Sequence, residues 1–244
     1  AGELPRVLLV VAILSVRPER RNAIRATWLK WGDDRVELRF FTEAPAKNDP
    51  DAESITTHLK KEMAAHQDLV VMDIAPGMNF AVKILWAMRW MSHHWTFDFF
   101  LRLDDDYFLC LRRLLHELEI TFGTTLEVPK IYAGHVTCKK RGEARIDEAY
   151  MLLSASLVIR VLSSTDLMCG SHGGVTTAWW FTPGNRLNEA GDVTWVHDPR
   201  LDHWGKAVAK EGPDDMCRRH MGVHRIYPDR MMNVWNRSQA YNES

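Results

Sequence analysis

The strongest chemical signal in the sequence is a run of three aspartates, Asp104, Asp105 and Asp106, directly after the apolar segment 97–103. In extended backbone, side chains two positions apart point the same way, so Asp104 and Asp106 can present two carboxylates to one point. Carboxylates suit hard divalent cations such as Mg²⁺ or Mn²⁺, which often also hold phosphate oxygens. A solvated acidic loop is the alternative, but three adjacent like charges beyond a buried strand repel one another and favour a counter-cation.

The elements around these aspartates alternate between short β-rich runs and longer helical patterns, which is typical of βαβ units. We therefore expect an α/β fold with a mostly parallel central sheet flanked by helices, as a single domain with an irregular C-terminal half. Ligands of open α/β sheets bind beyond the carboxyl ends of the strands, where the three aspartates fall. The expected strands are 7–15, 36–41, 69–72, 97–103 and 131–136, and the expected helices are 19–31, 55–66, 80–94 and 152–162.

The composition excludes several classes of protein. With 244 residues, 46% of them hydrophobic and 26% charged, the chain is neither disordered nor collagen-like nor a small disulfide scaffold. Lys+Arg 31 against Asp+Glu 32 leave a formal charge of −1, so no global field recruits nucleic acid or an anionic membrane. The most apolar run, 7–14, is far shorter than the roughly 20 residues of a membrane-spanning helix. Any membrane anchor is therefore expected outside this sequence.

The cysteines and the polar C-terminal stretch give weaker signals. Four thiols without metal-ligand spacing allow three disulfide pairings, among which the sequence does not choose, and reduced buried thiols fit equally well. Glycosylation sequons begin at Asn236 and Asn242, in a stretch that we expect to be a tail, 236–244, after a domain spanning 1–235. The cysteines are Cys110, Cys138, Cys169 and Cys217.

Five segments in a fixed order resemble the motifs of one enzyme family. They are 19–28, similar to R-x-x-x-R-x-T-W; 79–83, similar to N-L-T-x-K; 101–108, similar to K-x-D-D-D-x-F; 197–201, similar to H-D-P-R-F; and 223–231, similar to H-x-x-x-P-x-x-M. The ordered set resembles the β-1,3-galactosyltransferase family, which includes the β-1,3-N-acetylglucosaminyltransferases and the fringe proteins. Each motif alone is weak, whereas the set spans most of the chain.

This resemblance implies a GT-A fold and an inverting transfer in the Golgi lumen. The donor would be a UDP-sugar, with galactose expected before N-acetylglucosamine, and the acceptor a glycan or glycoprotein, linked β-1,3. It implies that Asp104 and Asp106, with His224, hold Mn²⁺ or Mg²⁺, which would neutralise charge on the UDP leaving group. The structural alternative to a binding role is an exposed basic helix face for Arg21 and Arg25, and a packed histidine for His224. The residues implied in the nucleotide pocket are Arg21, Arg25, Lys83, Asp104 and Asp105.

The base of such a transfer has no counterpart at the matching position. An inverting transfer needs a group that takes the proton of the acceptor hydroxyl, and the family supplies a carboxylate in an E-D-V motif. The matching segment here is Gly173-Gly174-Val175, with Gly174 at the position of the base. A second departure is Glu148-Ala149-Tyr150, where the family has a glycine run. The competing candidates for the base are Asp192, His172 and Asp166.

Other functions remain consistent with the sequence. The chain fits a pseudoenzyme or partner subunit that binds a nucleotide sugar without turnover. It also fits a different metal-dependent phosphoryl or nucleotidyl enzyme, or a glycan-binding protein whose ten tryptophans stack on sugars. Binding of UDP that requires the metal separates the nucleotide-sugar functions from glycan binding alone, and turnover separates the enzyme from the pseudoenzyme.

Overall fold

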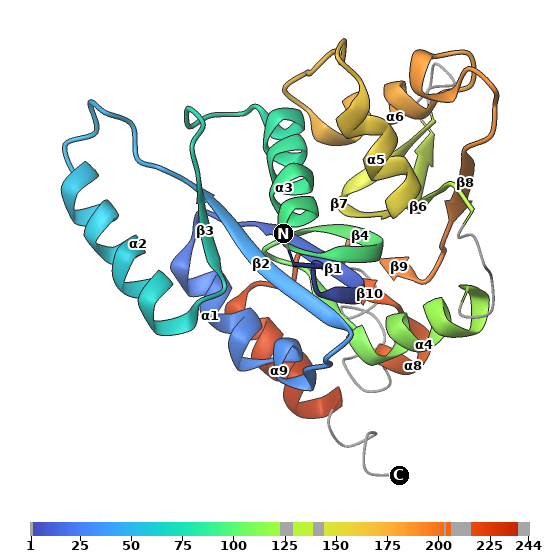
Figure 1. The fold of residues 1–244 in the computed structure, drawn as a ribbon. Helices are drawn as coiled ribbons and strands as arrows, with labels where there is room; N and C mark the ends of the chain where they lie inside the picture. The colour runs from blue at the N-terminus through green and yellow to red at the C-terminus, as the bar shows by residue number, and fades with distance from the viewer. Residues whose placement is uncertain (1, 123–128, 139–143, 203, 206–215, 239–244) are drawn as a thin grey trace.

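A mixed sheet of seven strands runs through the middle of the molecule (Figure 1). The computed structural model describes residues 2–122, 129–138, 144–202, 204–205 and 216–238. From one edge of the sheet to the other, the strands are β3 (Leu69–Met72), β2 (Val36–Glu43), β1 (Arg6–Leu14), β4 (Thr96–Asp104), β7 (Ala144–Ser154), β6 (Ile131–Cys138) and β8 (Thr194–His197).

The sheet has a parallel part, formed by the first four strands, and a mixed part, formed by the other three. β1 pairs in parallel with both β2 and β4, and β2 pairs in parallel with β3. β7 is antiparallel to β4 and to β6, while β8 is parallel to β6. The first four strands therefore end at the same edge of the sheet, and β6 and β8 run in the same direction as β4. This confirms the predicted α/β class with a mostly parallel sheet.

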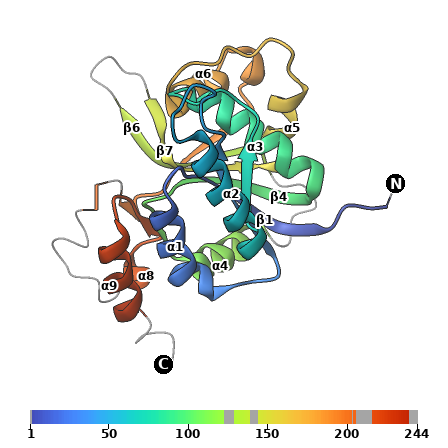
Figure 2. The same cartoon turned by 90° about the vertical axis from the view of Figure 1, so that its left-hand side faces the viewer.

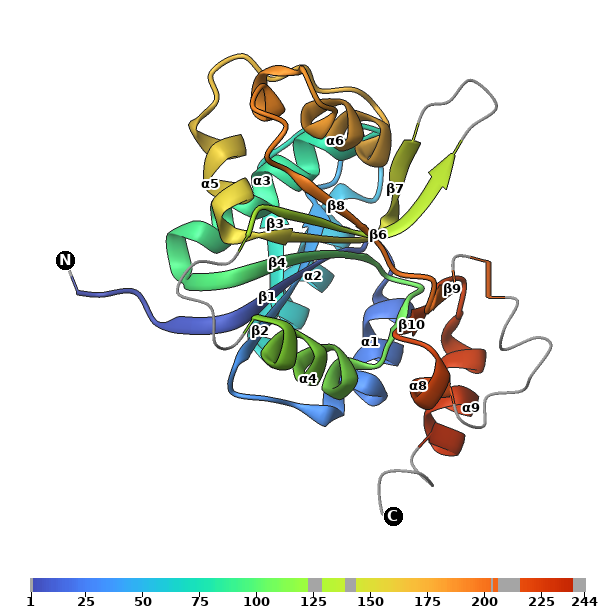
Figure 3. The same ribbon diagram turned by 90° about the vertical axis from the view of Figure 1, so that its right-hand side faces the viewer.

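Helices cover both faces of the sheet, as the two side views show (Figures 2 and 3). α3 (Phe80–His94), α5 (Ala155–Ser163) and α6 (Gly173–Phe181) contribute to one buried apolar cluster. α1 (Pro18–Ala26), α4 (Leu111–Phe122) and α9 (Pro228–Ser238) contribute to the other. The remaining helical segments are α2 (Ala52–His66), α8 (Met216–Arg219) and the 3₁₀ turns η1 (Trp28–Trp31) and η2 (Arg186–Asn188).

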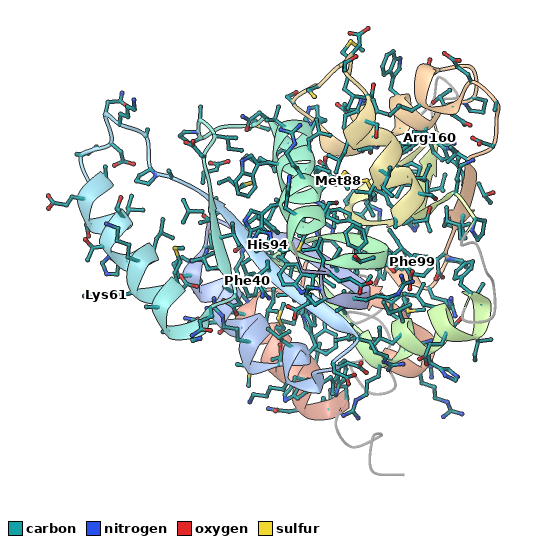
Figure 4. All side chains as sticks on the ribbon, viewed as in Figure 1. Phe40, Lys61, Met88, His94, Phe99 and Arg160 are labelled. Atoms are coloured by element: carbon teal, nitrogen blue, oxygen red, sulfur yellow. A yellow bond between two sulfur atoms is a disulfide. The ribbon has the colours of Figure 1, made fainter. Side chains whose placement is uncertain are left out.

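The alternation of side chains along β1 explains the two clusters. Leu9, Val11 and Ile13 pack into the cluster with α1 and α4, whereas Val10 and Ala12 pack into the cluster with α3. A strand covered on both faces is apolar at every position, as the sequence of β1 indicates. Figure 4 labels Phe40 and Phe99, which are fully buried, and Lys61, which points outward from α2.

A second, smaller sheet joins distant parts of the chain. It consists of β5 (Phe108–Leu109), β10 (Gly222–Val223) and β9 (Leu201–Asp202), with β10 antiparallel to β5 and parallel to β9. Beside it, Cys110 and Cys217 form a disulfide with their Cα atoms 5.3 Å apart. Cys138 and Cys169 are free and exposed. The structure thus selects a pairing that the sequence left open.

Several predicted boundaries change in the structure. β3 and α3 have the predicted bounds, but the predicted helix 19–31 divides into α1 and η1. The predicted helix 152–162 is wrong at its start, because residues 152–154 continue β7 as the partner of β4 and the helix begins only after Ser154. Residues 236–238 of the predicted tail belong to α9, and 239–244, including Asn242, lie outside the described residues. Among the described residues, we find no helix both long and apolar enough to span a bilayer.

Candidate active site

The three aspartates lie at the edge where all four parallel strands end. Leu14, Glu43, Met72 and Asp104, at the ends of β1, β2, β3 and β4, all line a cavity of about 430 Å³. The cavity thus lies where an open α/β sheet binds its ligands. The start of α1, the start of α3 and the segment after β10 complete its wall.

Asp104, Asp106 and His224 form the candidate metal-binding group of this cavity. One ligand atom from each residue lies within 4.8 Å of the others. His224 Nε2 is 3.5 Å from Asp104 Oδ2 and 3.1 Å from Asp106 Oδ1. Two carboxylates and an imidazole are a donor set that suits Mn²⁺. The residues present therefore fit the cation that the sequence implied.

The small sheet brings His224 to the aspartates across most of the sequence. β10 pairs Val223 with Phe108 of β5, two residues after Asp106. The backbone N–H of Ile226 then donates to the carbonyl oxygen of Asp106 at 2.9 Å. His224 lies between these two contacts, so backbone pairing fixes its distance from the carboxylates.

The charges around this group already favour a cation between the two carboxylates. Burial raises the pKa of Asp104, but the Arg102 guanidinium and His224 outweigh it and hold the pKa below its ordinary value. Arg102 is almost fully buried and its Nη2 lies 2.6 Å from Asp104 Oδ1. Burial lowers the pKa of His224, but its hydrogen bonds with Asp104 and Asp106 outweigh this and raise it to about 9. The two carboxylates thus face the guanidinium of Arg102 as well as the imidazole of His224.

Asp105 has a different role from its two neighbours. It accepts hydrogen bonds from Ser15 Oγ at 2.8 Å and from Arg20 Nη1 at 2.6 Å. Burial is the larger effect and raises the pKa of Asp105 in spite of these two donors. Arg20 also lies 3.6 Å from Asp106 Oδ2, and its guanidinium stands 5.0 Å from the ring centre of Tyr227. Sequence reasoning missed Arg20, although it lines the cavity.

Of the other positively charged residues predicted for the pocket, one lines the cavity and two lie elsewhere. Lys83 lines the cavity, pairs with Glu43, and has its pKa lowered by burial and by nearby Arg102. Arg21 and Arg25, expected in the same pocket, do not line it.

Arg21 and Arg25 are held by carboxylates on the other side of α1. Arg21 is fully buried, with Nη2 2.5 Å from Glu62 Oε2, and Arg25 pairs with both Glu62 and Asp68 at 2.8 and 2.7 Å. The two arginines share one helix face because they stand four positions apart, and this face packs towards α2. Their ion pairs thus join α1 to α2 and to Asp68, the residue before β3.

Asp192 lies at the opposite end of the strands from the three aspartates. It precedes β8, which runs in the same direction as β4, so it lies at the amino end of the strands, whereas Asp104 lies at the carboxyl end. Its carboxylate is paired with Lys130 at 2.5 Å and Arg160 at 2.8 Å, and Figure 4 shows Arg160 on α5. The structure therefore does not bring Asp192 to the aspartates, and the sequence did not show at which end of the sheet this residue falls.

The other two candidates lie nearer in the fold but outside the cavity wall. His172 is exposed immediately before α6, next to Ser171, whose carbonyl accepts a hydrogen bond from the backbone N–H of Phe80 at 3.2 Å. Asp166 is exposed between α5 and α6. Neither lines the cavity that contains the aspartates.

A second, larger cavity of about 840 Å³ lies between α6 and strands β6, β7 and β8. Its wall includes Trp179, Trp195, His197 and Arg145. Trp179 is 45% exposed, so a flat aromatic face is open to a ligand there. Exposed aromatic rings of this kind pack against the apolar faces of ligands and offer a polar edge as well.

Comparison with known proteins decides the family. Residues 19–155, more than half of the chain, match the family model described as Galactosyltransferase. The chain belongs to the galactosyltransferase family. It is a glycosyltransferase by this membership, and the resemblance found in its sequence motifs is confirmed. The mixed sheet flanked by helices agrees with the GT-A-like fold that the resemblance implied.

Two curated relatives are β-1,3-galactosyltransferases. The chain is 25% identical over 252 residues to β-1,3-galactosyltransferase 6 of Mus musculus, a match that covers 88% of this chain and 74% of the relative. It is 30% identical over 122 residues to β-1,3-galactosyltransferase 4 of Canis lupus familiaris, covering 48% of this chain and 32% of the relative. The chain is thus similar to the mouse protein along most of its own length.

Solved structures with a similar fold include other glycosyltransferases. One is involved in the glycosylation of the major capsid of PBCV-1, with a TM-score of 0.48, 11% identity, and 93% of this chain and 98% of that chain covered. Another is the mannosyltransferase PcManGT from Pyrobaculum calidifontis, with a TM-score of 0.46, 13% identity and coverages of 80% and 55%. With TM-scores below 0.5, they leave the assignment to rest on the family match.

Proposed function

We propose that this protein transfers a hexose, galactose in preference to N-acetylglucosamine, from a UDP-sugar to a glycan or glycoprotein acceptor. The new linkage is β-1,3 and the anomeric configuration inverts. The observation that carries the proposal is the meeting of Asp104, Asp106 and His224 in the wall of a cavity at the carboxyl edge of the sheet. A nucleotide diphosphate and a divalent cation are the ligands that suit such a site.

Different residues of the cavity would bind the metal and the diphosphate of the donor. Asp104, Asp106 and His224 would hold Mn²⁺, and a cation bound there acts as a Lewis acid on the diphosphate oxygens. Arg20 and Lys83 present positive charge to the same space. Asp105 holds the guanidinium of Arg20 in place before any ligand arrives, so little ordering is required on binding.

The second cavity is the proposed place of the acceptor. Trp179 and Trp195 offer aromatic surface, while His197 and Arg145 offer polar groups for hydroxyls. This combination of an apolar floor and a few polar groups is typical of small-molecule sites. The cavity lies on α6, whose first turn approaches the donor side through Phe80.

We place the protein in the lumen of the Golgi. The disulfide between Cys110 and Cys217 supports this placement, because disulfides persist in the oxidising secretory pathway and are rare in the cytosol. The family resemblance supports it as well.

Calorimetric titration with UDP tests the donor site. We expect binding in the presence of Mn²⁺ and none in EDTA, and Asp106→Asn should abolish the metal-dependent binding. The matched control is Asp68→Asn, a partly buried carboxylate that pairs with Arg25 outside the cavity, and this variant should bind UDP normally. Undiminished binding by Asp106→Asn would contradict the metal assignment. Turnover of UDP-galactose with a glycan acceptor then separates an enzyme from a pseudoenzyme.

A further inference from the structure

Strand β7 is irregular at Glu148, close to the candidate active site. Its pairing with β6 shifts between Ile146, opposite Val136, and Met151, opposite Gly134. Five steps along β7 thus span two steps along β6, and Glu148 lies within this bulge. Bulges of this kind redirect a side chain and are frequent beside active sites. The pairing of Tyr150 with Leu103 of β4 places the bulge at the same edge of the sheet as Asp104.

The carboxylate of Glu148 reaches the first turn of α6. Its Oε2 accepts a hydrogen bond from the backbone N–H of Gly174 at 2.9 Å. A Cβ atom on Gly173 would lie 3.0 Å from this same oxygen, and one on Gly174 would lie 3.3 Å from Glu148 Cβ and 2.9 Å from the carbonyl oxygen of Ile146. Side chains at 173 and 174 would therefore crowd Glu148.

The two departures from the family pattern thus lie in contact with each other. The carboxylate is absent from 173 and 174, where the family resemblance leads us to expect it, and a carboxylate from Glu148 occupies the space beside them. The glycines leave room for it, and the backbone N–H of Gly174 donates a hydrogen bond to it. Glu148 was noted in the sequence only because it interrupts an expected glycine run.

Glu148 lines neither cavity itself, but its contacts at Gly173 and Gly174 lead to residues that line both. The Cβ position of Gly173 is 3.5 Å from Phe80 Cβ, and Phe80 lines the cavity that contains the aspartates. Val175, directly after Gly174, lines the second cavity. The carboxylate bound at Gly174 therefore lies next to a segment that contacts the wall of the donor cavity through Phe80 and the wall of the second cavity through Val175.

We propose that Glu148 is the general base of the transfer, an inference that rests on the proposed function. The oxygen of the acceptor hydroxyl forms a bond with the anomeric carbon of the hexose as the bond from that carbon to the phosphate oxygen breaks. The electron pair of the broken bond leaves with UDP, and the hydroxyl proton passes to the carboxylate of Glu148. Water then takes this proton and restores the carboxylate.

The decisive variant is Glu148→Gln, which keeps the shape of the side chain and an oxygen to accept from Gly174. We expect kcat for hexose transfer to fall by roughly 10²–10⁴-fold, the contribution typical of a general base. The dissociation constant of UDP in Mn²⁺ should not change. The control Asp192→Asn removes an exposed carboxylate at the other end of the strands and should leave kcat unchanged.

Three outcomes decide the matter. Loss of transfer in Glu148→Gln with normal UDP binding supports the inference. Transfer by Glu148→Gln within about threefold of the parent protein overturns the inference and leaves the proposed function in place. A parent protein that binds UDP with Mn²⁺ but transfers no hexose overturns the proposed function and the base with it.

A double variant tests whether a carboxylate at this place, supplied by another residue, is enough for transfer. In Glu148→Ala/Gly173→Asp, the new carboxyl group is attached to a Cβ that lies 3.0 Å from the former position of Glu148 Oε2. The remaining close neighbour is Ile84 Cδ1 at 2.6 Å, the end of a flexible side chain. We expect the double variant to recover at least tenfold in kcat over Glu148→Ala, and equal activity of the two counts against the inference.

Discussion

Arg20 and Arg21 are neighbours in sequence, yet their guanidinium groups have opposite roles. Arg20 pairs with Asp105 in the cavity wall, whereas Arg21 is fully buried against Glu62. With 3.6 residues per helical turn, adjacent side chains point about 100° apart. The motif around these residues indicated a basic helix beside the nucleotide, but it did not indicate which arginine faces which way. Glu62, which decides this, comes 41 positions later in the chain.

The buried pair of Arg21 and Glu62 predicts a pH-dependent loss of stability. Burial raises the pKa of Glu62, but the hydrogen bonds from Arg21 and Arg25 outweigh it and hold the pKa below its ordinary value. Because the folded pKa is below the unfolded value of about 4.3, this carboxylate stabilises the fold above that pH, and the contribution is lost as the pH falls. Glu62→Gln should cost about 3 kcal/mol at pH 7, as breaking buried pairs does.

Urea unfolding of the two proteins at pH 7, 5, 4 and 3 measures this effect. The stability difference between the parent protein and Glu62→Gln should be the same at pH 7 and 5 and should shrink below about pH 4.3, where the unfolded carboxylate takes up its proton before the folded one does. A difference that stays constant across this range would contradict the assignment.

Among the elements, the small sheet is the one on which the metal-binding group depends. The side chain of Tyr107 is almost fully buried, with its ring centre 5.8 Å from that of Tyr150 and 6.0 Å from that of His224. Gly222 of β10 lies against this ring, and a Cβ there would be 2.4 Å from Tyr107 Cε1 and 3.1 Å from the carbonyl oxygen of Phe108. The pairing of β10 with β5 therefore requires glycine at this position.

Gly222→Ala should displace either the tyrosine ring or β10. We expect a loss of about 1–3 kcal/mol in stability, the usual cost of overpacking a core, together with weaker Mn²⁺-dependent binding of UDP because His224 follows β10. Thermal unfolding and calorimetry measure the two effects. Gly2→Ala is the control, since no atom lies within 4 Å of a Cβ at that position. A fully stable Gly222→Ala protein would show that Tyr107 adjusts at no cost.

The elements that the sequence predicted well have clear periodicity and clear ends. β3 and α3 are flanked by turn residues, and their bounds match the predicted ones. β5, β9 and β10 have two residues each, too few for any periodic pattern, and no prediction included them. β7 passes directly into α5 through apolar residues on both sides of Ser154, so composition alone did not separate the strand from the helix.

For the molecule as a whole, the disulfide closes a loop of great length. Cys110 and Cys217 are 107 positions apart and flank the small sheet. Cross-linking so long a loop restricts the unfolded chain and stabilises the fold by about 3–5 kcal/mol. Cys110→Ala/Cys217→Ala should therefore lower Tm by roughly 10 °C. Scanning calorimetry checks this, and Cys138→Ala/Cys169→Ala, which removes the two exposed free thiols, should leave Tm unchanged.

The candidate site also shows the limit of reading motifs one at a time. The residues of the candidate metal-binding group were predicted because each stands in its own recognisable motif, and the structure brings them together. The carboxylate at the start of α6 was not found because Glu148 and Gly174 lie 26 positions apart. Only the bulge in β7 and the first turn of α6 make them neighbours.

The late position of His224 has a consequence for biosynthesis. As the chain leaves the ribosome, the aspartates emerge more than a hundred residues before the histidine, so a nascent chain carries the acidic part of the site without its third group. All seven strands of the central sheet end by His197. A premature stop codon between His197 and His224 would therefore spare every strand of this sheet and remove the imidazole. Only molecules translated beyond that codon acquire the full set of ligands.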